Sequence, residues 1–470
     1  MQLVIFFLMI LTNTYADYPA LKAVLSEKGL RDVSQMMAVW IQNKLKTIEI
    51  PEIRGGVDIG IGTVHYVISN MRVVQCRMSG PSMEFEQGTG VSVEVNQLSL
   101  AVTGSWSTRF GIIHDGGSFD LVVYNIRIQT LLGLGDEAGR LSITTISCSD
   151  NVGGVDIQFH GGASFFFQPF VSSFKGHISE MIHERICPAI QQAISELEDN
   201  LQEVTVNITV DKYIYLSILL TSSPAVTDQS FELDIKGEFY SISHPSEPPF
   251  SASAFFVQYA ENYMLSLAAS EFLVNSAAYA FLSSEVLQIN ITDNMIPKSF
   301  PLHLNTSQFG AFIPQLRTLY PNMEMQVLLY ASKTPLFSFS SGMIDLHVSA
   351  AAKFSAVQPD GMLVPLFRLD VDGSFSGSAL IDNKHLTGDF KMKNLTLTVG
   401  SSEIGDFKTA VIEQMLVIAV NSFAIPKLND YLKTGFRLPT LQHFSLVNSK
   451  LLIKNGFVVI FTDVEDSWTV

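Results

Sequence analysis

The stretch SISHPSEPPF, residues 241–250, divides this chain of 470 residues into two halves. Three prolines and three serines in ten positions, without helical or strand periodicity, are typical of a linker. A chain of this length exceeds one ordinary hydrophobic core. We therefore expect one domain at 17–240 and a second at 251–470, on either side of the linker 241–250.

The N-terminus carries a short apolar run, Leu3 to Leu11, followed by the small-residue site Thr14-Tyr15-Ala16. This pattern predicts a secretory signal at residues 1–16 and a secreted, extracellular protein. Four Asn-x-Ser/Thr triplets agree with that route and predict a glycoprotein. The acceptors are Asn207, Asn290, Asn305 and Asn394.

The first half carries two apolar-faced helices, one near its start and one before the return strands expected at 204–220. Residues 28–50 place apolar side chains on one helical face, and a second helix is expected over 169–201, with Pro188 inside it. Strands are expected between them, to about residue 160. Val91, Val93 and Val95 alternate in one phase, whereas Leu98, Leu100 and Val102 alternate in the other. That change of phase predicts a β-bulge at Asn96-Gln97, as a strongly curved sheet requires.

The second half repeats this architecture without repeating its sequence. Short helices near 268–284 and 307–320 precede strands over 325–400, and a long helix over 406–433 contains Pro426. A strand pair follows at 443–463. Both halves thus predict a curved antiparallel sheet, a long helix with an internal proline, and return strands. The expected fold is α+β with a pseudo-twofold relation.

Composition excludes several classes of protein. Apolar residues make up 47 % and charged residues 16 %, against about 25 % charged in an ordinary soluble domain. Past the N-terminus, the most apolar stretch, 410–425, is interrupted by Glu413, Gln414 and Asn421, so no membrane-spanning helix is expected. The net charge of −16 argues against nucleic-acid binding. The excess apolar content predicts large cores or a slot with apolar walls, which favours acyl chains.

Catalytic and metal motifs are missing from the sequence. The stretch GSFSG at 373–377 has Phe375 where a G-x-S-x-G nucleophile would stand. His177 and His183 are six residues apart on a predicted helix and do not share a face as a metal pair would. We expect a protein that is not an enzyme and has no metal or cofactor.

Three cysteines, Cys76, Cys148 and Cys187, allow one disulfide and leave one thiol. Their spacing does not choose among the three pairs.

Five stretches are similar to one family: 28–55, 233–250, 293–316, 320–332 and 424–440. The chain resembles the secreted lipid-binding family of bactericidal/permeability-increasing protein and lipopolysaccharide-binding protein. The resemblance implies a monomeric boomerang of two elongated antiparallel-sheet barrels, each wrapped with long helices and joined by a central sheet. It also implies an apolar pocket in each barrel that holds a phospholipid. Candidates for the first pocket are Val33, Met37, Trp40, Phe174, Ile178 and Ile182.

The resemblance further implies a role in innate immunity, with antimicrobial action. It pairs Cys148 with Cys187 and leaves Cys76 as a thiol within a strand. It places binding of lipopolysaccharide, at the bacterial outer membrane surface, on the tip of the N-terminal barrel. The matching hairpin here is Gly104 to Phe119, and the tip candidates are Trp106, Arg109 and Lys175.

The tip departs from the strongly basic pattern of antibacterial relatives. Asp115 stands in the hairpin, and Glu180 and Glu184 stand beside Lys175 and Arg185 in the second helix. Residues 1–249 hold 15 Lys and Arg against 27 Asp and Glu, a net of −12. Two hypotheses follow: a protein of innate defence that binds lipopolysaccharide, or a carrier of host phospholipid or other apolar lipid without antibacterial action.

Overall fold

The computed structural model describes residues 18–47, 50–58, 60–162, 171–258, 260–298, 300–438 and 444–466. The chain divides into two compact units. Leu25–Val204 together with Ser223–Glu232 forms what we call the N-terminal unit, and the rest of the described chain forms the C-terminal unit.

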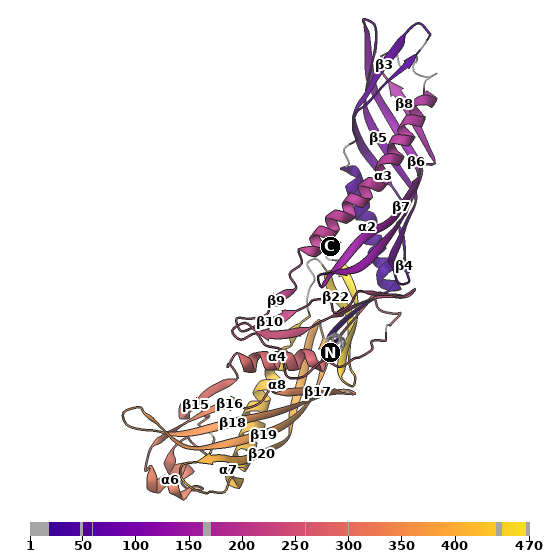
Figure 1. Cartoon of the computed structure of the whole chain (residues 1–470). Coiled ribbons are helices and arrows are strands. Elements are labelled where there is room, and N and C mark those ends of the chain that lie inside the picture. The colour runs from indigo at the N-terminus through magenta and orange to yellow at the C-terminus, as the bar shows by residue number, and fades with distance from the viewer. Residues whose placement is uncertain are drawn as a thin grey trace, which may run out of the picture. The chain divides into compact units, whose positions relative to one another are not determined.

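A seven-stranded antiparallel sheet is the framework of the N-terminal unit (Figure 1). The strands are β2 (Ile53–Asp58), β3 (Thr63–Arg77), β4 (Ser82–Glu86), β5 (Gly90–Phe110), β6 (Ile113–Glu137), β7 (Arg140–Asn151) and β8 (Gly154–His160). They lie in the order β2-β3-β5-β6-β7, with β4 paired to β5 and β8 to β6. The helices α2 (Glu27–Lys46) and α3 (Val171–Gln202) accompany this sheet.

Alternating apolar residues build the core under this sheet. Val95, Leu98, Val102 and Phe119 are each at most 4 % exposed and belong to one cluster, to which α3 contributes Ile178. The register between β5 and β6 shifts between Val95 and Leu98, which confirms the predicted bulge. The bulge changes the phase of β5, so that odd positions before it and even positions after it face the same side of the sheet.

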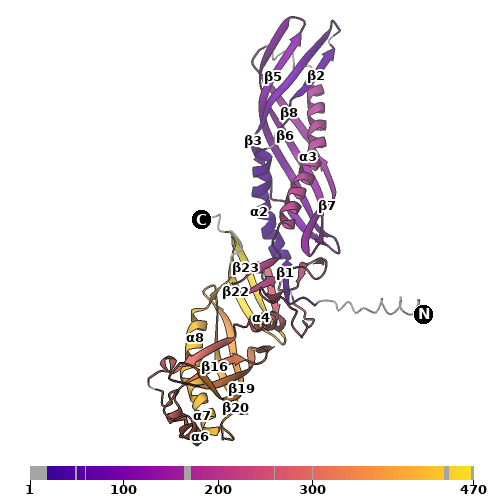
Figure 2. The same cartoon turned by 60° about the vertical axis from the view of Figure 1, so that its left-hand side comes forward.

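The C-terminal unit contains a second seven-stranded antiparallel sheet (Figure 2). Its strands are β15 (Gln288–Thr292), β16 (Glu324–Ala331), β17 (Leu336–Ser340), β18 (Met343–Val357), β19 (Leu363–Asp382), β20 (His385–Ser402) and β21 (Phe436–Arg437). They lie in the order β15-β16-β18-β19-β20-β21, with β17 paired to β18. The predicted short helices are α4 (Glu271–Ser283), α5 (Thr306–Phe309) and α6 (Pro314–Leu319).

The long helix of this unit has three parts: α7 (Ala410–Ala419), a π-helical turn (Val420–Ala424) and α8 (Ile425–Thr434). The wider turn ends two residues before Pro426 and contains the carbonyl of Ser422, four residues earlier, with which the proline ring would clash in an ordinary α-helix. Gly435 has φ 73° and ends the helix, as the sequence predicts.

Among the described residues, the helical run Ala410–Thr434 is long and apolar enough to cross a membrane by composition alone. Its polar side chains bind the sheet instead. Glu413 Oε2 accepts a hydrogen bond from Leu397 N at 2.8 Å, and the amide of Asn429 accepts from Phe390 N and donates to Phe390 O. The helix is therefore fastened to β20.

Two smaller sheets complete the fold. A six-stranded sheet, which collects strands from both ends of the chain, has the order β11-β12-β1-β14-β23-β22, and a three-stranded sheet has the order β13-β10-β9. Their strands are β1 (Leu21–Ser26), β9 (Asn207–Thr209), β10 (Ile214–Ser217), β11 (Ala225–Val226), β12 (Ser230–Ile235), β13 (Glu238–Ser241), β14 (Leu265–Ser270), β22 (Phe444–Ile453) and β23 (Phe457–Asp466).

The α+β class with large curled antiparallel sheets is confirmed. The predicted domain boundaries follow the order of the chain, whereas each compact unit takes segments from more than one part of it, so those boundaries stay a prediction. The signal predicted at 1–16 lies outside the described residues.

Candidate functional site

Two turns of the N-terminal unit lie at the same end of its sheet. His65 near the start of β3 pairs with Arg109 near the end of β5. The turn that precedes β3 and the turn that follows β5 therefore lie at the same end of the sheet. The second turn closes between Phe110 and Ile113, with Gly111 at φ 58°, a conformation that glycine adopts without strain. Figure 1 shows both turns at one end of the unit.

Three isoleucines project from these turns into solvent. Ile61 is 81 % exposed, Ile112 is 96 % exposed and Ile113 is 64 % exposed. Beneath them the ring of Phe110 lies so close to Gly62 that a β-carbon there would come within 3.0 Å of it. We call Ile61, Ile112 and Ile113 the isoleucine tip. Such a cluster at a strand end has no packing role within the unit, which is typical of an interaction surface.

One arginine and two histidines cross the sheet just below the isoleucine tip. Arg109 lies opposite His65 on one side and His114 on the other, and all three side chains are exposed. Arg109 Nε donates a long hydrogen bond of 3.5 Å to Gly111 O. Asp115 accepts from Gly116 N at 2.8 Å, and its carboxylate lies beside Gly162. This end of the sheet therefore carries one permanent positive charge, on Arg109, and one carboxylate, on Asp115.

Trp106, the first of the tip candidates, lies in the core of the unit. Trp106 is only 4 % exposed, its Nε1 donates to His160 O at 3.2 Å, and its ring meets Phe159 edge-on. The reason is strand phase: after the bulge, even positions of β5 face the core, as Val102 does. Extending that alternation through the hairpin would have predicted the burial of Trp106.

Lys175, the third tip candidate, is engaged in an ion pair. Its Nζ lies 2.6 Å from Asp156 Oδ1 on β8. Arg109 is thus the tip candidate that keeps both an exposed position and a cationic group without an ion pair among the described residues. The sequence did not single out Ile61, Ile112 or Ile113, because only the pairing of β3 with β5 brings their two turns together.

The six pocket candidates have different positions in the structure. Ile178 is buried at 1 % exposure, and Ile182 packs against the same core cluster. Val33 and Met37 are half-buried on α2, whose contacts with that cluster pass through Ile41 and Leu45. The side chains of Trp40 and Phe174 lie outside the described residues.

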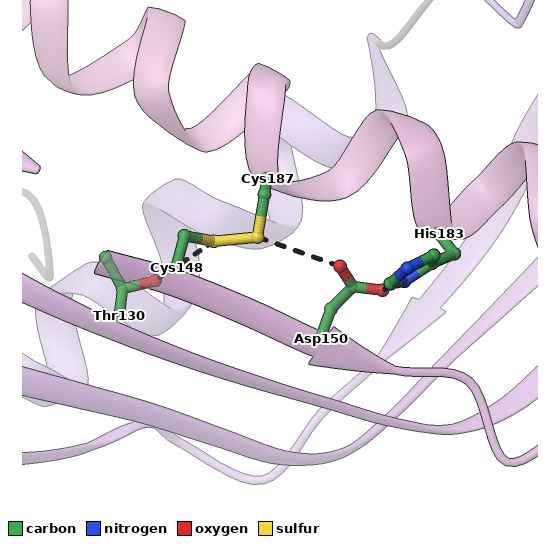
Figure 3. Close-up of a disulfide and its surroundings, with 5 residues drawn as sticks. All are labelled: Thr130, Cys148, Asp150, His183 and Cys187. Carbon is green, nitrogen blue, oxygen red and sulfur yellow. Dashed lines mark hydrogen bonds and ion pairs between the residues drawn. A yellow bond between two sulfur atoms is a disulfide. The ribbon is translucent and has the colours of Figure 1, made fainter.

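Cys148 of β7 and Cys187 of α3 form a disulfide with a Cα–Cα distance of 5.8 Å, as the resemblance implies (Figure 3). Asp150 lies beside it and also contacts His183 Nδ1 at 2.8 Å; this hydrogen bond and the charge of Asp150 raise the pKa of His183.

Cys76 is a free, half-buried thiol on β3, and burial raises its pKa. Within the described chain, no group of three His, Cys, Asp or Glu side chains is placed to hold a metal ion.

The predicted glycosylation acceptors also differ in accessibility. Asn207, Asn290 and Asn394 are exposed on strands. Asn305 is half-buried, and its Oδ1 caps α5 by accepting from Gln308 N at 2.8 Å. Occupancy of all four stays a prediction.

Comparisons with known proteins cover nearly the whole chain. Residues 29–197 match the N-terminal domain of the LBP / BPI / CETP family, and residues 208–465 match its C-terminal domain. The bactericidal permeability-increasing protein of Sebastes schlegelii is 34 % identical over 96 % of this chain and 96 % of its own length. The lipopolysaccharide-binding protein of Homo sapiens is 28 % identical over 95 % and 94 %. A crystal structure of lipopolysaccharide binding protein has the same fold, with a TM-score of 0.62 and 24 % identity over 96 % of this chain and 100 % of that one.

Proposed function

The chain belongs to the LBP / BPI / CETP family, and from this premise we propose that it is a secreted lipid-binding protein that recognises bacterial lipopolysaccharide. The names of two full-length relatives, one a bactericidal permeability-increasing protein and one a lipopolysaccharide-binding protein, support this proposal. The proposed setting is extracellular innate defence.

The isoleucine tip is the observation that carries the proposal. Burying an exposed isoleucine side chain in an apolar phase is worth about 2 kcal/mol. Three of them can therefore supply on the order of 6 kcal/mol toward insertion among acyl chains. Their position at the end of the sheet lets them enter a lipid surface without exposing strand edges.

The charges near the tip make the phosphate contact the weaker part of recognition. Arg109 can form a charge-assisted hydrogen bond to a lipid phosphate. Lys175 is already paired with Asp156, and Asp115 adds negative charge at the same end. We therefore expect recognition that depends on acyl chains more than on phosphates, with weak killing of bacteria.

The same charges favour a second candidate function, that of a carrier for host phospholipid or other apolar lipid. A net charge of −16 opposes approach to anionic bacterial surfaces, whereas a neutral lipid surface meets no such barrier. In both functions we propose that the monomer holds phospholipid beside α2 and α3, with no other cofactor.

Vesicle binding tests the proposal directly. The triple variant Ile61→Ser/Ile112→Ser/Ile113→Ser and a control, Ile146→Ser, are each mixed with lipopolysaccharide aggregates and with neutral phosphatidylcholine vesicles. Ile146 is 54 % exposed on β7, away from the tip. We expect the triple variant to bind lipopolysaccharide at least 100-fold more weakly, which corresponds to about 2.8 kcal/mol, and the control to bind like the natural protein.

The two lipids separate the two functions. Tight binding of lipopolysaccharide and weak binding of phosphatidylcholine support the first function, and the reverse supports the carrier. Lipopolysaccharide binding that survives unchanged in the triple variant would exclude the isoleucine tip as the contact.

A further inference from the structure

A polar hollow of about 710 Å³ opens where the β5 bulge meets β6 and the end of β7. Its lining residues are Glu94, Asn96, Gln97, Asn125, Arg127, Asn151 and Gly153. Counted along β5 from Phe110 to Gln97, it lies roughly 40 Å from the isoleucine tip at about 3.3 Å per residue. Its volume falls within the range of small-molecule sites, about 300–1,000 Å³.

The backbone around the hollow is built for this shape. Gln97 has φ 57° and Asn125 has φ 54°, both in the left-handed region. Asparagine is common there, but glutamine is not, so Gln97 holds its place at a conformational cost. Gly153 N donates to Asn125 O, and a β-carbon on Gly153 would lie 2.5 Å from Asn125 Cβ. Only glycine permits this close approach.

Hydrogen bonds fix several of the lining side chains. Arg127 Nε donates to Asn96 Oδ1 at 3.0 Å, and Ser79 Oγ donates to Asn96 O at the same distance. Gln129 Nε2 donates to Glu94 Oε1 at 3.2 Å, which holds the carboxylate of Glu94 in place. Asn151 lies directly across the ladder from Arg127. The side chains of Glu94, Asn96 and Arg127 are thus held in place before any ligand arrives.

The chemistry of the lining selects one class of ligand. Four amide side chains each present both a donor and an acceptor, which is what a hydroxyl group needs from its partners. One carboxylate and one guanidinium leave the lining without net charge, so neither a phosphate nor a cation is favoured. Apart from Gly153, every lining side chain is polar, so an acyl chain gains nothing by entering. We propose that this hollow binds a saccharide.

The site goes beyond the proposed lipid function and does not require it; only the choice of the first glycan rests on that function.

The full-length protein is titrated by calorimetry with a lipid-free oligosaccharide released from lipopolysaccharide by mild acid, and separately with lipid A. The double variant Arg127→Ala/Asn151→Ala is compared with Arg72→Ala, an exposed arginine elsewhere on the same sheet. We expect the double variant to bind the oligosaccharide at least tenfold more weakly, and Arg72→Ala to bind unchanged.

Gln97→Gly provides a variant that is expected to keep the fold, because glycine adopts the left-handed φ without strain while removing one amide from the hollow. It is expected to melt at an equal or higher temperature and to bind the oligosaccharide more weakly. Oligosaccharide binding equal to that of the natural protein in both hollow variants overturns the proposal. So does the absence of oligosaccharide binding, with lipid A binding retained, which leaves the lipid function standing. Binding of oligosaccharide without lipid A supports the saccharide site and removes the proposed recognition of lipopolysaccharide through its lipid.

Discussion

The two units fasten a long helix to an open sheet edge in related but different ways. In the N-terminal unit α3 contacts β7, and Glu198 Oε2 accepts from Ile143 N at 2.5 Å. In the C-terminal unit the helix contacts β20, and Glu413 Oε2 accepts from Leu397 N at 2.8 Å. β7 is the last strand in the order of its sheet, and β20 is followed only by the short strand β21. In each case a helix carboxylate accepts a hydrogen bond from a strand N–H that has no partner in a neighbouring strand of the described chain.

The second attachment is where the units differ. The N-terminal unit uses a covalent bond between Cys148 and Cys187, whereas the C-terminal unit uses the paired hydrogen bonds of Asn429 with Phe390. The comparison indicates that curled sheets need the helix at their open edge, while the chemistry of the attachment is free to change. Three experiments test this interpretation.

Removing the disulfide should have the largest effect. Without the disulfide the unfolded chain gains conformational entropy. For a separation of 39 residues between the cysteines, this gain predicts a loss of roughly 4 kcal/mol of folding stability. We expect the double variant Cys148→Ser/Cys187→Ser to exchange its α3 amide hydrogens much faster, while α7 and α8 keep their protection. Hydrogen exchange with mass spectrometry measures both units in one sample. Equal acceleration of exchange in α3 and in α7 and α8 would contradict a specific role of the disulfide in fastening α3.

Replacing Asn429 should have an intermediate effect on the other unit. Asn429→Ala leaves the N–H and C=O of Phe390 without these partners, at a cost of about 2 kcal/mol. Denaturant unfolding followed by amide exchange near Phe390 measures the change. The matched control is Asn421→Ala, an exposed amide in the π-helical turn of the same helix. A control that destabilises as much as Asn429→Ala would show that general helix loosening, rather than the bond to β20, is responsible.

Neutralising the two carboxylates should have the smallest effect, and the same effect in each unit. Glu198→Gln and Glu413→Gln keep an acceptor oxygen but lose the charge that strengthens the hydrogen bond. We expect each variant to lose about 1 kcal/mol of stability. Exchange rates of the Ile143 and Leu397 amides report the two bonds separately. A marked inequality between the variants would mean that the two carboxylates are not equivalent.

Local patterns in the sequence predicted much of this fold. The bulge at Asn96-Gln97 followed from a change of strand phase, and the π-helical turn stands beside the proline that interrupts the helical pattern. The resemblance places Trp106 in the tip hairpin, whereas the strand phase of β5 indicates that its side chain faces the core.

Features that depend on distant pairing could not be predicted in this way. Ile61 joins Ile112 only through the register of β3 against β5, two strands that are separated by another strand in the sequence. The polar hollow likewise needs the bulge of β5, the left-handed Asn125 of β6 and Asn151 of β7 at one place. No local pattern contains such an arrangement, because each strand alone shows only a polar residue at a bend.

The covered edge of β7 also has a consequence for how the chain acquires its structure. During folding, the sheet of the N-terminal unit can form before α3 docks on β7. The edge of β7 then presents a row of unpaired backbone N–H and C=O groups, which can pair with other chains. The pairing of β3 with β5 and of β6 with β8 joins strands that are separated in sequence by another strand, and such pairing is slower than hairpin formation, which prolongs that stage. Formation of the disulfide between Cys148 and Cys187 ends this stage, because it holds α3 against β7. Production in a reducing cytosol is therefore expected to yield aggregates, and production in an oxidising compartment to yield soluble protein.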